Sequence, residues 1–480
     1  MNLFGRATLK MAMGGIAGQL IPVMISPLLT RLYTPENFGV FSSFMAIASI
    51  LTIPATLRFD LALVRCDDDV EAASLGILGW MFASVFLGVI AVFVVLFDSL
   101  VVPLSSLHPL GLQLALVPVL AWITATQWIF LAAATRNRSY GVIAAGNVVQ
   151  QFASAVLAIG LDLFGLGAWG LIHARFWSTV VYVGMLARLG ARGFITQGRY
   201  VSSQARGLLS RHRKFPLFNV PISVSGNLST YFPILALTSF HITGLAGQFA
   251  IARMIVSLPS NFLTSTMSHV FYREGVMRLG TPQFGELLLG LSRSLVLIFI
   301  PAYFFLGYWG ESIFEFVFGD KWKGAGNVLT YLALPFALAT LTGWPERVFE
   351  IRAKQQWSFT IQLGFDLLTV TGIVAVLAAG WDAFLVIKVF AVLQTAYQLV
   401  FLAAIYILAG LGLASFFRIV ALVAGLIAAM TLVSVLLTRS DWLTPFFDAS
   451  VLALIAGGIS LLGVRQFVLV LWREPDAPEA

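Results

Sequence analysis

The chain has 480 residues, of which 59% are hydrophobic and 11% are charged, and its formal net charge is +7 at pH 7. Because soluble domains carry about 25% charged residues, this composition excludes a soluble globular protein and indicates an integral membrane protein. The positive charge is then expected on loops at a membrane surface, and no nucleic-acid partner is expected. With Cys66 as the single cysteine, neither an intrachain disulfide nor a cysteine-based metal site is expected.

Hydrophobic runs of about 20 residues span a bilayer as helices, and the hydropathy of the chain predicts about 14 of them. The expected spans are 10–30, 37–57, 72–97, 111–134, 141–161, 166–187, 217–240, 244–271, 288–308, 326–345, 357–379, 382–408, 417–438 and 445–465. The first run is too long for a signal peptide and contains Pro22 and Pro27, which favours a retained first span.

Basic residues are distributed unevenly between the two sides of these spans. The loops on the side of the N-terminus contain Arg58, Arg65, Arg136, Arg138, Arg273, Arg278, Arg347, Arg352, Lys354 and Arg418. The opposite loops contain Arg31, Lys321, Lys323 and Arg439. Since basic loops stay in the cytoplasm, both termini are expected there. The basic segment 188–215 is interpreted as a linker lying on an anionic leaflet, with a docking site for a partner enzyme as the alternative.

A long internal repeat relates the two halves of the chain. At an offset of about 208 residues, Gly39 and Phe41 match Gly247 and Phe249 without a gap. The sequence therefore predicts two similar six-helix bundles. The expected domains are the bundles 1–187 and 216–408, the basic linker 188–215, two further spans in 409–466 and a cytoplasmic tail at 467–480.

Three basic residues, Arg175, Arg253 and Lys388, fall well inside expected spans. Each costs about 2.5–3.5 kcal/mol at the centre of a membrane helix, so we expect them to act on a substrate or to face water. Two structural roles stay open, namely Arg175 as a strut bonded to helix carbonyls and Lys388 as a side chain that snorkels to the interface. Asp366, the one clear intramembrane acid, either pairs with a basic residue or binds a coupling ion.

Amide and hydroxyl side chains at helical spacing accompany these charges, as expected for the lining of a wet cavity. The expected lining comprises Gln19, Asn147, Gln150, Gln151, Asn227, Ser257, Asn261 and Gln362. The alternative is that these residues hold helices together, at about 0.6 kcal/mol per contact. A basic chamber favours a phosphate- or carboxylate-bearing solute, since Arg binds phosphate through two parallel hydrogen bonds. The expected substrate is an amphiphile with an anionic joint and a sugar head group.

Several segments resemble Wzx-type polysaccharide flippases of the multidrug/oligosaccharidyl-lipid/polysaccharide exporter superfamily. They are T-R-L-Y-T-P-E-N-F-G-V-F at 30–41, L-R-F-D-L-A-L-V at 57–64, F-A-I-A-R-M-I-V-S-L-P at 249–259 and V-F-Y-R-E at 270–274. The resemblance implies an all-α, MATE-like fold in the bacterial inner membrane, with two six-helix bundles related by a pseudo-two-fold axis and two additional C-terminal helices.

The same resemblance implies a function. Such proteins move undecaprenyl-diphosphate-linked oligosaccharides from the cytoplasmic to the periplasmic leaflet by alternating access, without enzyme activity or a cofactor. Membrane lipids, a polysaccharide polymerase and glycosyltransferases are the implied partners. By this resemblance Arg31, Arg175, Arg253 and Lys388 contact the diphosphate and acidic sugars. By the same resemblance, Arg58 and Asp60 are expected to form a cytoplasmic gate.

Other functions stay open at this point. A lipid II flippase differs only in the head group of its substrate. A multidrug/cation antiporter of the same superfamily is expected to carry a carboxylate in its N-terminal bundle, and the first span has none. A membrane glycosyltransferase or polymerase needs a carboxylate-rich catalytic loop, whereas the loops here are short. An ATP-driven transporter needs a G-x-x-x-x-G-K-[ST] segment, which the sequence lacks.

Overall fold

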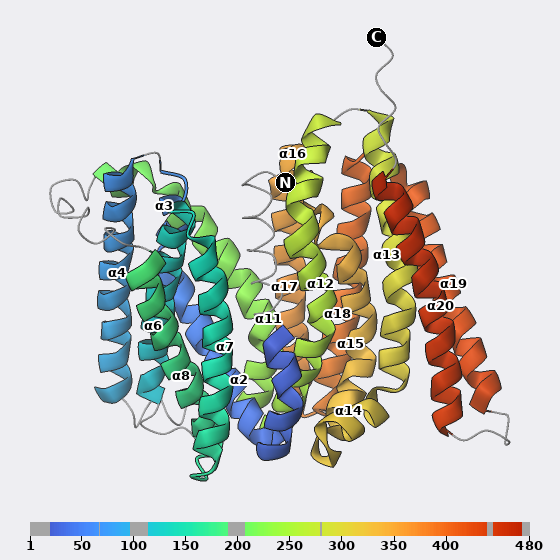
Figure 1. Cartoon of the computed structure of the whole chain (residues 1–480), viewed down its shortest axis with the longest axis horizontal. Helices are drawn as coiled ribbons and strands as arrows, with labels where there is room; N and C mark the ends of the chain where they lie inside the picture. The colour runs from blue at the N-terminus through green and yellow to red at the C-terminus, as the bar shows by residue number, and fades with distance from the viewer. Residues whose placement is uncertain are drawn as a thin grey trace. The chain divides into compact units, whose positions relative to one another are not determined.

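The computed structural model describes residues 20–66, 68–96, 114–190, 207–278, 281–438 and 445–472. These residues form helices joined by short connections, and none of them forms a strand (Figure 1). Within this part of the chain, 11 helices are long and apolar enough to cross a membrane. The protein is therefore an all-α, multi-pass membrane protein, as its hydropathy predicts. The count of 14 spans and the domain bounds stay predictions.

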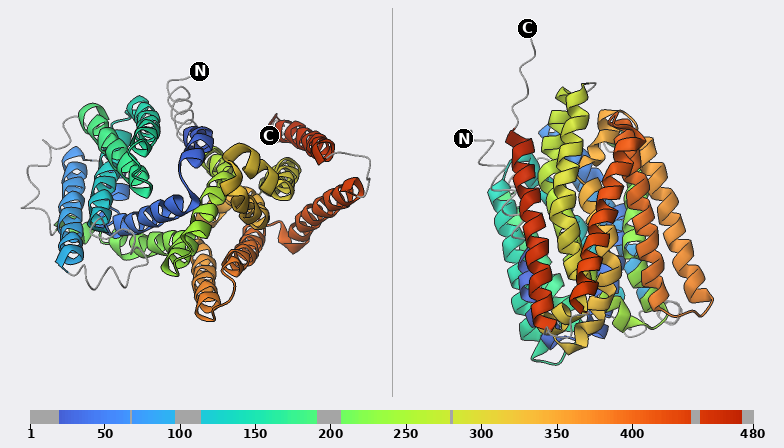
Figure 2. Two further views of the ribbon diagram at one scale, coloured as in Figure 1. Left: turned by 90° about the horizontal axis from the view of Figure 1, so that it is seen from below. Right: turned by 90° about the vertical axis from the view of Figure 1, so that its right-hand side faces the viewer.

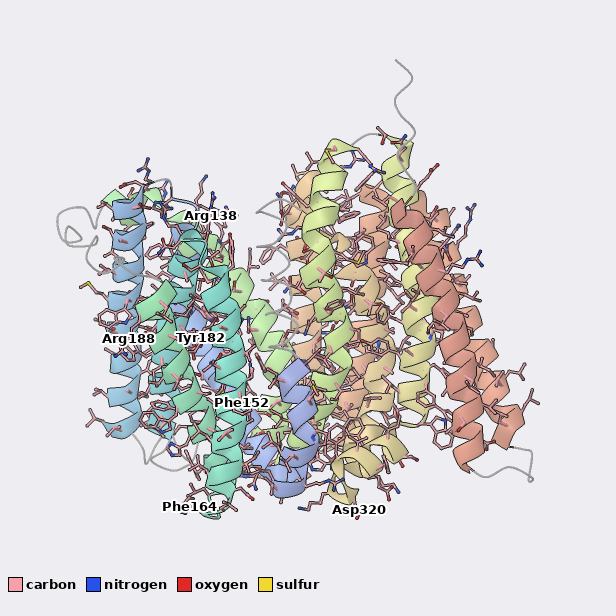
Figure 3. All side chains as sticks on the ribbon, in the orientation of Figure 1. Arg138, Phe152, Phe164, Tyr182, Arg188 and Asp320 are labelled. Carbon is pink, nitrogen blue, oxygen red and sulfur yellow. The ribbon has the colours of Figure 1, made fainter. Side chains whose placement is uncertain are left out.

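The chain divides into two compact units, of which the first comprises Met1–Ala250 and Val370–Phe384. The first unit contains the apolar helix Leu20–Leu32, α2 (Pro35–Ala55), α3 (Phe59–Leu63), α4 (Asp69–Leu96), α6 (Leu116–Arg136), α7 (Tyr140–Asp162), α8 (Ala168–Met185), α11 (Val220–Ser239) and the start of α12 (Thr243–Met277). A π-helical turn, Leu186–Gly190, follows α8, and another, Phe215–Asn219, precedes α11. Around α2 pack α4, α6, α8 and α11. Figure 3 shows Tyr182 inside this unit, with Arg138 and Phe164 at its opposite ends.

The second unit comprises Ile251–Thr369 and Leu385–Ala480. It contains most of α12, α13 (Pro282–Tyr308), α14 (Gly310–Phe318), α15 (Lys323–Thr342), α16 (Val348–Ile351), most of α17 (Gln355–Ala378), α18 (Phe384–Leu408), α19 (Gly412–Thr438) and α20 (Pro445–Trp472). Short 3₁₀ turns, Asp320–Trp322 and Pro345–Arg347, flank α15. Both α19 and α20 pack on α13 (Figure 2). The last helix thus ends at Trp472, beyond the expected end of its span at residue 465.

The burial of the helices separates a protein core from a lipid-facing periphery. In the most apolar 18-residue stretch of α15, 61% of the residues are buried inside the protein, compared with 17% in the corresponding stretch of α20. The exposed side of α4 carries Val85, Val89, Val92 and Phe93. Since a membrane helix does not need to hide apolar side chains from lipid, exposed hydrophobic residues on these helices are expected.

The sequence explains why α2 begins where it does. Thr34 is the N-cap, and its hydroxyl accepts a hydrogen bond from the backbone N–H of Asn37 at 3.4 Å. Pro35 occupies the first helical position, where its missing N–H costs no hydrogen bond. Glu36 places a negative charge in the first turn, where it interacts favourably with the helix dipole. The T-P-E-N segment, part of the sequence that carries the resemblance, is therefore a helix start.

Two glycines related by the internal repeat bring the first turns of α2 and α12 into backbone contact, within the first unit. A Cβ built on Gly39 would overlap the carbonyl oxygen of Thr243, and one on Gly247 would overlap that of Pro35. The contact is reciprocal, because the offset that matches Gly39 to Gly247 also matches Pro35 to Thr243. Small residues permit such close crossings between membrane helices. The repeat thus positions equivalent residues against each other at this crossing.

Candidate substrate-binding site

Arg175 lies in the middle of α8 and is half-buried in the first unit. Its backbone carbonyl accepts hydrogen bonds from the hydroxyls of Ser178 at 2.9 Å and Thr179 at 2.8 Å. Its guanidinium lies within electrostatic range of Tyr231 on α11. The Ser178 and Thr179 hydroxyls therefore bond to the backbone carbonyl of Arg175 and not to its guanidinium. The guanidinium lies near Tyr231 of α11. Tyr231 is a neighbour that the sequence patterns did not single out.

The amides of α7 divide between helix packing and partial exposure. Gln150 is 2% exposed, and its Nε2 donates to the Thr179 hydroxyl at 3.1 Å and to Gln127 Oε1 at 3.4 Å. In this conformation Gln150 therefore joins α7 to α8 and α6, as the helix-packing alternative anticipates. Asn147 and Gln151 are half-buried. The lining role of these three amides stays a prediction.

Asn227 joins α11 to α2. Its Oδ1 accepts a hydrogen bond from the Ser49 hydroxyl at 3.3 Å, and its Nδ2 donates to the Ser223 carbonyl at 3.0 Å. Both partners lie in spans of the first unit, so the pair contributes polar contact along the packing face of α2 and α11.

We expect the Ser49–Asn227 contact to be measurable but modest. A double-mutant cycle of Ser49→Ala and Asn227→Ala should give a coupling of about 0.6 kcal/mol, the average for such contacts between membrane helices. Thermal unfolding of the purified protein in detergent measures it. Strictly additive single variants would show that the two side chains do not stabilise each other.

Arg58 and Asp60 lie in the connection between α2 and α4, outside the candidate spans. Arg58 Nη1 is 3.8 Å from Asp60 Oδ2, and the Arg58 guanidinium lies 5.4 Å from the ring centre of Trp128 on α6. Leu57 and Arg58 both adopt positive φ, at 50° and 56°, which costs a non-glycine residue roughly 1–2 kcal/mol. A strained, ion-paired turn of this kind suits an element that changes conformation, and the gate role of Arg58 and Asp60 stays a prediction.

Burial raises the pKa of Asp60 above its ordinary value of 3.8, although Arg58 and the Thr56 hydroxyl oppose the shift. Between the ordinary pKa of this carboxyl group and its raised pKa in the folded state, the folded state binds more protons than the unfolded state. The free energy of unfolding therefore falls as pH rises through this window. We expect Asp60→Asn to lose that part of the pH dependence, measured as the melting temperature against pH. Glu286→Gln, at an exposed position, is the control. An unchanged profile in Asp60→Asn would contradict the assignment.

In the second unit, Arg253, Ser257 and Asn261 follow one another at intervals of four along α12, and hence on one face. Arg253 and Ser257 are half-buried and Asn261 is exposed. Pro259 interrupts the same stretch and removes one helical hydrogen bond. A polar, proline-interrupted face is characteristic of membrane helices that border a cavity.

A second polar group forms between α17 and α18. Asp366 and Gln362, one turn apart on α17, are half-buried, and Tyr397 of α18 lies within electrostatic range of both Asp366 and Glu346. The ring of Tyr397 is 5.8 Å from that of Phe365. Tyr397 and Glu346 were missed from the sequence, although Gln394, Tyr397 and Gln398 form a visible polar stripe at i, i+3 and i+4.

Lys388 is exposed, and its ammonium lies 5.6 Å from the ring centre of Tyr331 on α15. It lies nine residues from Tyr397 along α18, about 14 Å at 1.5 Å per residue. Arg31 is exposed at the end of the first described helix, and Gln19 lies outside the described residues.

The candidate charged residues divide between the two units. Arg175 belongs to the first unit, whereas Arg253, Lys388 and Asp366 belong to the second. Their convergence on one chamber stays a prediction.

An apolar cavity of about 240 Å³ lies between α13, α15 and α19 in the second unit. Its lining includes Ile300, Phe304, Leu334 and Ile427. Such a lining suits an aliphatic chain rather than a charged group.

Comparison with known proteins identifies the class. Residues 28–327 match the family described as "Polysaccharide biosynthesis protein", and the chain belongs to this family. The succinoglycan biosynthesis transport protein ExoT of Rhizobium meliloti is 23% identical over 323 residues, 65% of this chain and 62% of that protein. The matched part thus spans less than two thirds of that relative.

Two solved structures share the fold. The lipid II flippase MurJ in an inward closed conformation matches with a TM-score of 0.69 and 14% identity, covering 98% of this chain and 100% of that one. An inward-facing MATE family multidrug resistance transporter of the MOP superfamily matches with a TM-score of 0.55 and 14% identity, covering 86% and 95%. At this identity the likeness establishes the fold, and it confirms the MATE-like architecture expected from the sequence.

Proposed function

We propose that this protein is a flippase that moves a polyprenyl-diphosphate-linked oligosaccharide from the cytoplasmic to the periplasmic leaflet. One observation carries the proposal. A member of a polysaccharide biosynthesis family keeps Arg175 and Arg253 within helices of a transporter fold, beside amides, hydroxyls and tyrosines. Cations in membrane helices are costly and are usually retained for function.

The chemistry of these residues fits the three parts of such a substrate. Guanidinium groups bind a diphosphate through charge-assisted, bidentate hydrogen bonds. Amides and hydroxyls, including Asn147, Gln151 and Gln362, offer donors and acceptors to sugar hydroxyls. The lipid tail requires only apolar surface, which the exposed faces of the peripheral helices provide.

The orientation and partners belong to the same proposal. Both termini lie in the cytoplasm, with the protein in the inner membrane of a bacterium, because the basic loops then lie inside. The oligosaccharide is built by glycosyltransferases on the cytoplasmic face and lengthened by a polymerase after translocation. Asp366 is either an ion pair partner or a coupling site, and loss of ion-gradient dependence in Asp366→Asn distinguishes the second role.

A strain lacking the gene tests the proposal. It should lose its surface polysaccharide and accumulate the complete lipid-linked repeat unit, and a plasmid copy should restore both. Normal surface polysaccharide in the deletion strain, together with sensitivity to cationic drugs, would favour an antiporter. Arrest of cell-wall synthesis with accumulation of lipid II would favour a lipid II flippase.

A further inference from the structure

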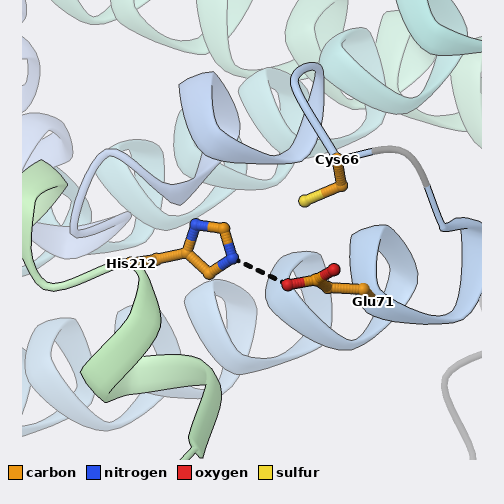
Figure 4. A group of neighbouring side chains, drawn as sticks. All are labelled: Cys66, Glu71 and His212. Carbon is orange, nitrogen blue, oxygen red and sulfur yellow. Dashed lines mark hydrogen bonds and ion pairs between the residues drawn. The ribbon is translucent and has the colours of Figure 1, made fainter.

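Three potential metal ligands from separate segments meet in the first unit, at the N-terminal end of the candidate span α4. Cys66 follows α3, Glu71 lies in the first turn of α4, and His212 follows a short helix over residues 207–211 (Figure 4). The Cys66 Sγ, a carboxylate oxygen of Glu71 and a ring nitrogen of His212 all lie within 4.8 Å of one another. His212 Nε2 is 2.9 Å from Glu71 Oε1.

The surrounding structure holds these side chains in place. Cys66 is 8% exposed and packs in an apolar cluster with Leu208, which belongs to the short helix that precedes His212. The side chains of His212 and Glu71 are 16% and 18% exposed. Arg136 donates a hydrogen bond to the Cys66 carbonyl and forms an ion pair with Asp69 at 2.6 Å. The ligand atoms therefore converge on a partly enclosed position rather than on an open surface.

A thiolate, an imidazole and a carboxylate are the ligands that Zn²⁺ accepts in tetrahedral sites, with bonds of about 2.0–2.3 Å. Tetrahedral geometry at these bond lengths requires ligand atoms about 3.3–3.7 Å apart. The longest separation, at most 4.8 Å, must therefore shorten by up to about 1 Å, and the 2.9 Å between His212 Nε2 and Glu71 Oε1 must open slightly to admit the ion. Three protein ligands leave the fourth position to water. Mg²⁺ and Ca²⁺ prefer sites made of oxygen atoms alone, and the sulfur ligand disfavours them.

We propose that Cys66, Glu71 and His212 bind a thiophilic divalent cation of the Zn²⁺ type, and that the ion fastens the basic linker to the N-terminal end of α4. From the cysteine count alone, no cysteine-based metal site is expected. The proposed site needs only one thiol, because nitrogen and oxygen ligands complete it. The ion replaces the proton of the Cys66 thiol, which is released to solvent. It also replaces the proton shared by His212 and Glu71, so the imidazole binds as the neutral tautomer that carries its proton on the other ring nitrogen.

Existing contacts of these side chains compete with the ion and can yield. The hydrogen bond between His212 Nε2 and Glu71 Oε1, at 2.9 Å, joins two of the ligand atoms and opens when the ion enters between them. Arg211 Nη1 lies 3.2 Å from Glu71 Oε1, but the Arg211 side chain is 72% exposed, and such surface ion pairs contribute little. The Cys66 thiol donates a weak hydrogen bond to the Ala62 carbonyl, with sulfur and oxygen 3.5 Å apart, and this bond ends when the thiol loses its proton.

Because Cys66 is the single cysteine, a thiol reagent reports on this site alone. With purified full-length protein in detergent, Zn²⁺ should slow modification of Cys66 by about tenfold or more, since the bound thiolate no longer attacks. Co²⁺ as a substitute probe should give one equivalent of a thiolate-to-metal charge-transfer band. Both signals should be lost in His212→Ala and in Glu71→Gln, and retained in the control His241→Asn.

Circular dichroism and size-exclusion chromatography establish that each variant is folded. Protection of Cys66 that persists undiminished in folded His212→Ala and Glu71→Gln would mean that a lone thiol binds the ion, and would overturn the proposal. So would the absence of protection and of a charge-transfer band in the parent protein. These outcomes do not depend on transport, and they leave the proposed flippase function unaffected.

Discussion

Arg175→Ala and Arg253→Ala are each expected to abolish surface polysaccharide while the protein still inserts and folds. Removing one charged partner of a diphosphate costs about 2–5 kcal/mol of binding, roughly 30-fold or more in affinity. Insertion should not suffer, because the substitution removes a cation from a membrane helix. The amount of surface polysaccharide per inserted molecule measures the effect.

The chemistry of the guanidinium makes the prediction specific. Arg253→Lys should retain part of the activity, since it keeps the charge and loses the bidentate fork. Arg418→Ala, at an exposed position in α19, is the matched control and should behave like the parent. Normal polysaccharide in both alanine variants would remove these arginines from the substrate path.

Gly39→Ala and Gly247→Ala are expected to have the largest effects on folding. Each added Cβ would overlap a backbone carbonyl across the crossing of α2 and α12, and backbone cannot move aside as a flexible side chain does. A cost of about 3 kcal/mol or more follows from such overpacking, and it should appear as loss of folded protein in fluorescence-detected size-exclusion chromatography.

A glycine elsewhere in the first unit provides the matched control for this crossing. At Gly160 in α7 an added Cβ meets no heavy atom within 4 Å, so Gly160→Ala should be neutral or slightly stabilising. Equal yields for Gly39→Ala, Gly247→Ala and Gly160→Ala would show that the two helices do not cross in contact in the folded protein.

The helical membrane fold could be predicted from the sequence because apolar runs of spanning length have a single structural solution in a bilayer. Hydropathy predicts α2 at residues 37–57, and the helix lies at Pro35–Ala55. It begins two residues earlier than expected because Thr34 caps it and Pro35 occupies its first position, which hydropathy does not register. The helices α8 and α12 do not meet the apolar criterion for a span, and these two helices carry Arg175 and Arg253. The charged residues on which the proposed function rests thus lower the hydropathy by which a membrane span is recognised.

The candidate site was less predictable. Helical spacing groups Arg253, Ser257 and Asn261 on one face of α12, but it does not say which amide is used for packing, as Gln150 is. No sequence pattern indicated Tyr231, whose place beside Arg175 depends on how α11 packs. Tyr397 lies in a polar stripe with Gln394 and Gln398, but its place beside Asp366 depends on how α18 packs against α17. The Cys66, Glu71 and His212 cluster joins segments that lie far apart in the sequence, and no local pattern connects them.

Translocation in proteoliposomes tests the central proposal most directly. Vesicles that contain a polyprenyl-diphosphate oligosaccharide are reconstituted with the purified protein, and a glycan-cleaving enzyme added outside reports how fast the inner-leaflet fraction becomes accessible. The parent protein should accelerate this exposure, and Arg175→Ala and Arg253→Ala should not. Exposure no faster than in protein-free vesicles, under every ion gradient applied, would contradict a flippase function.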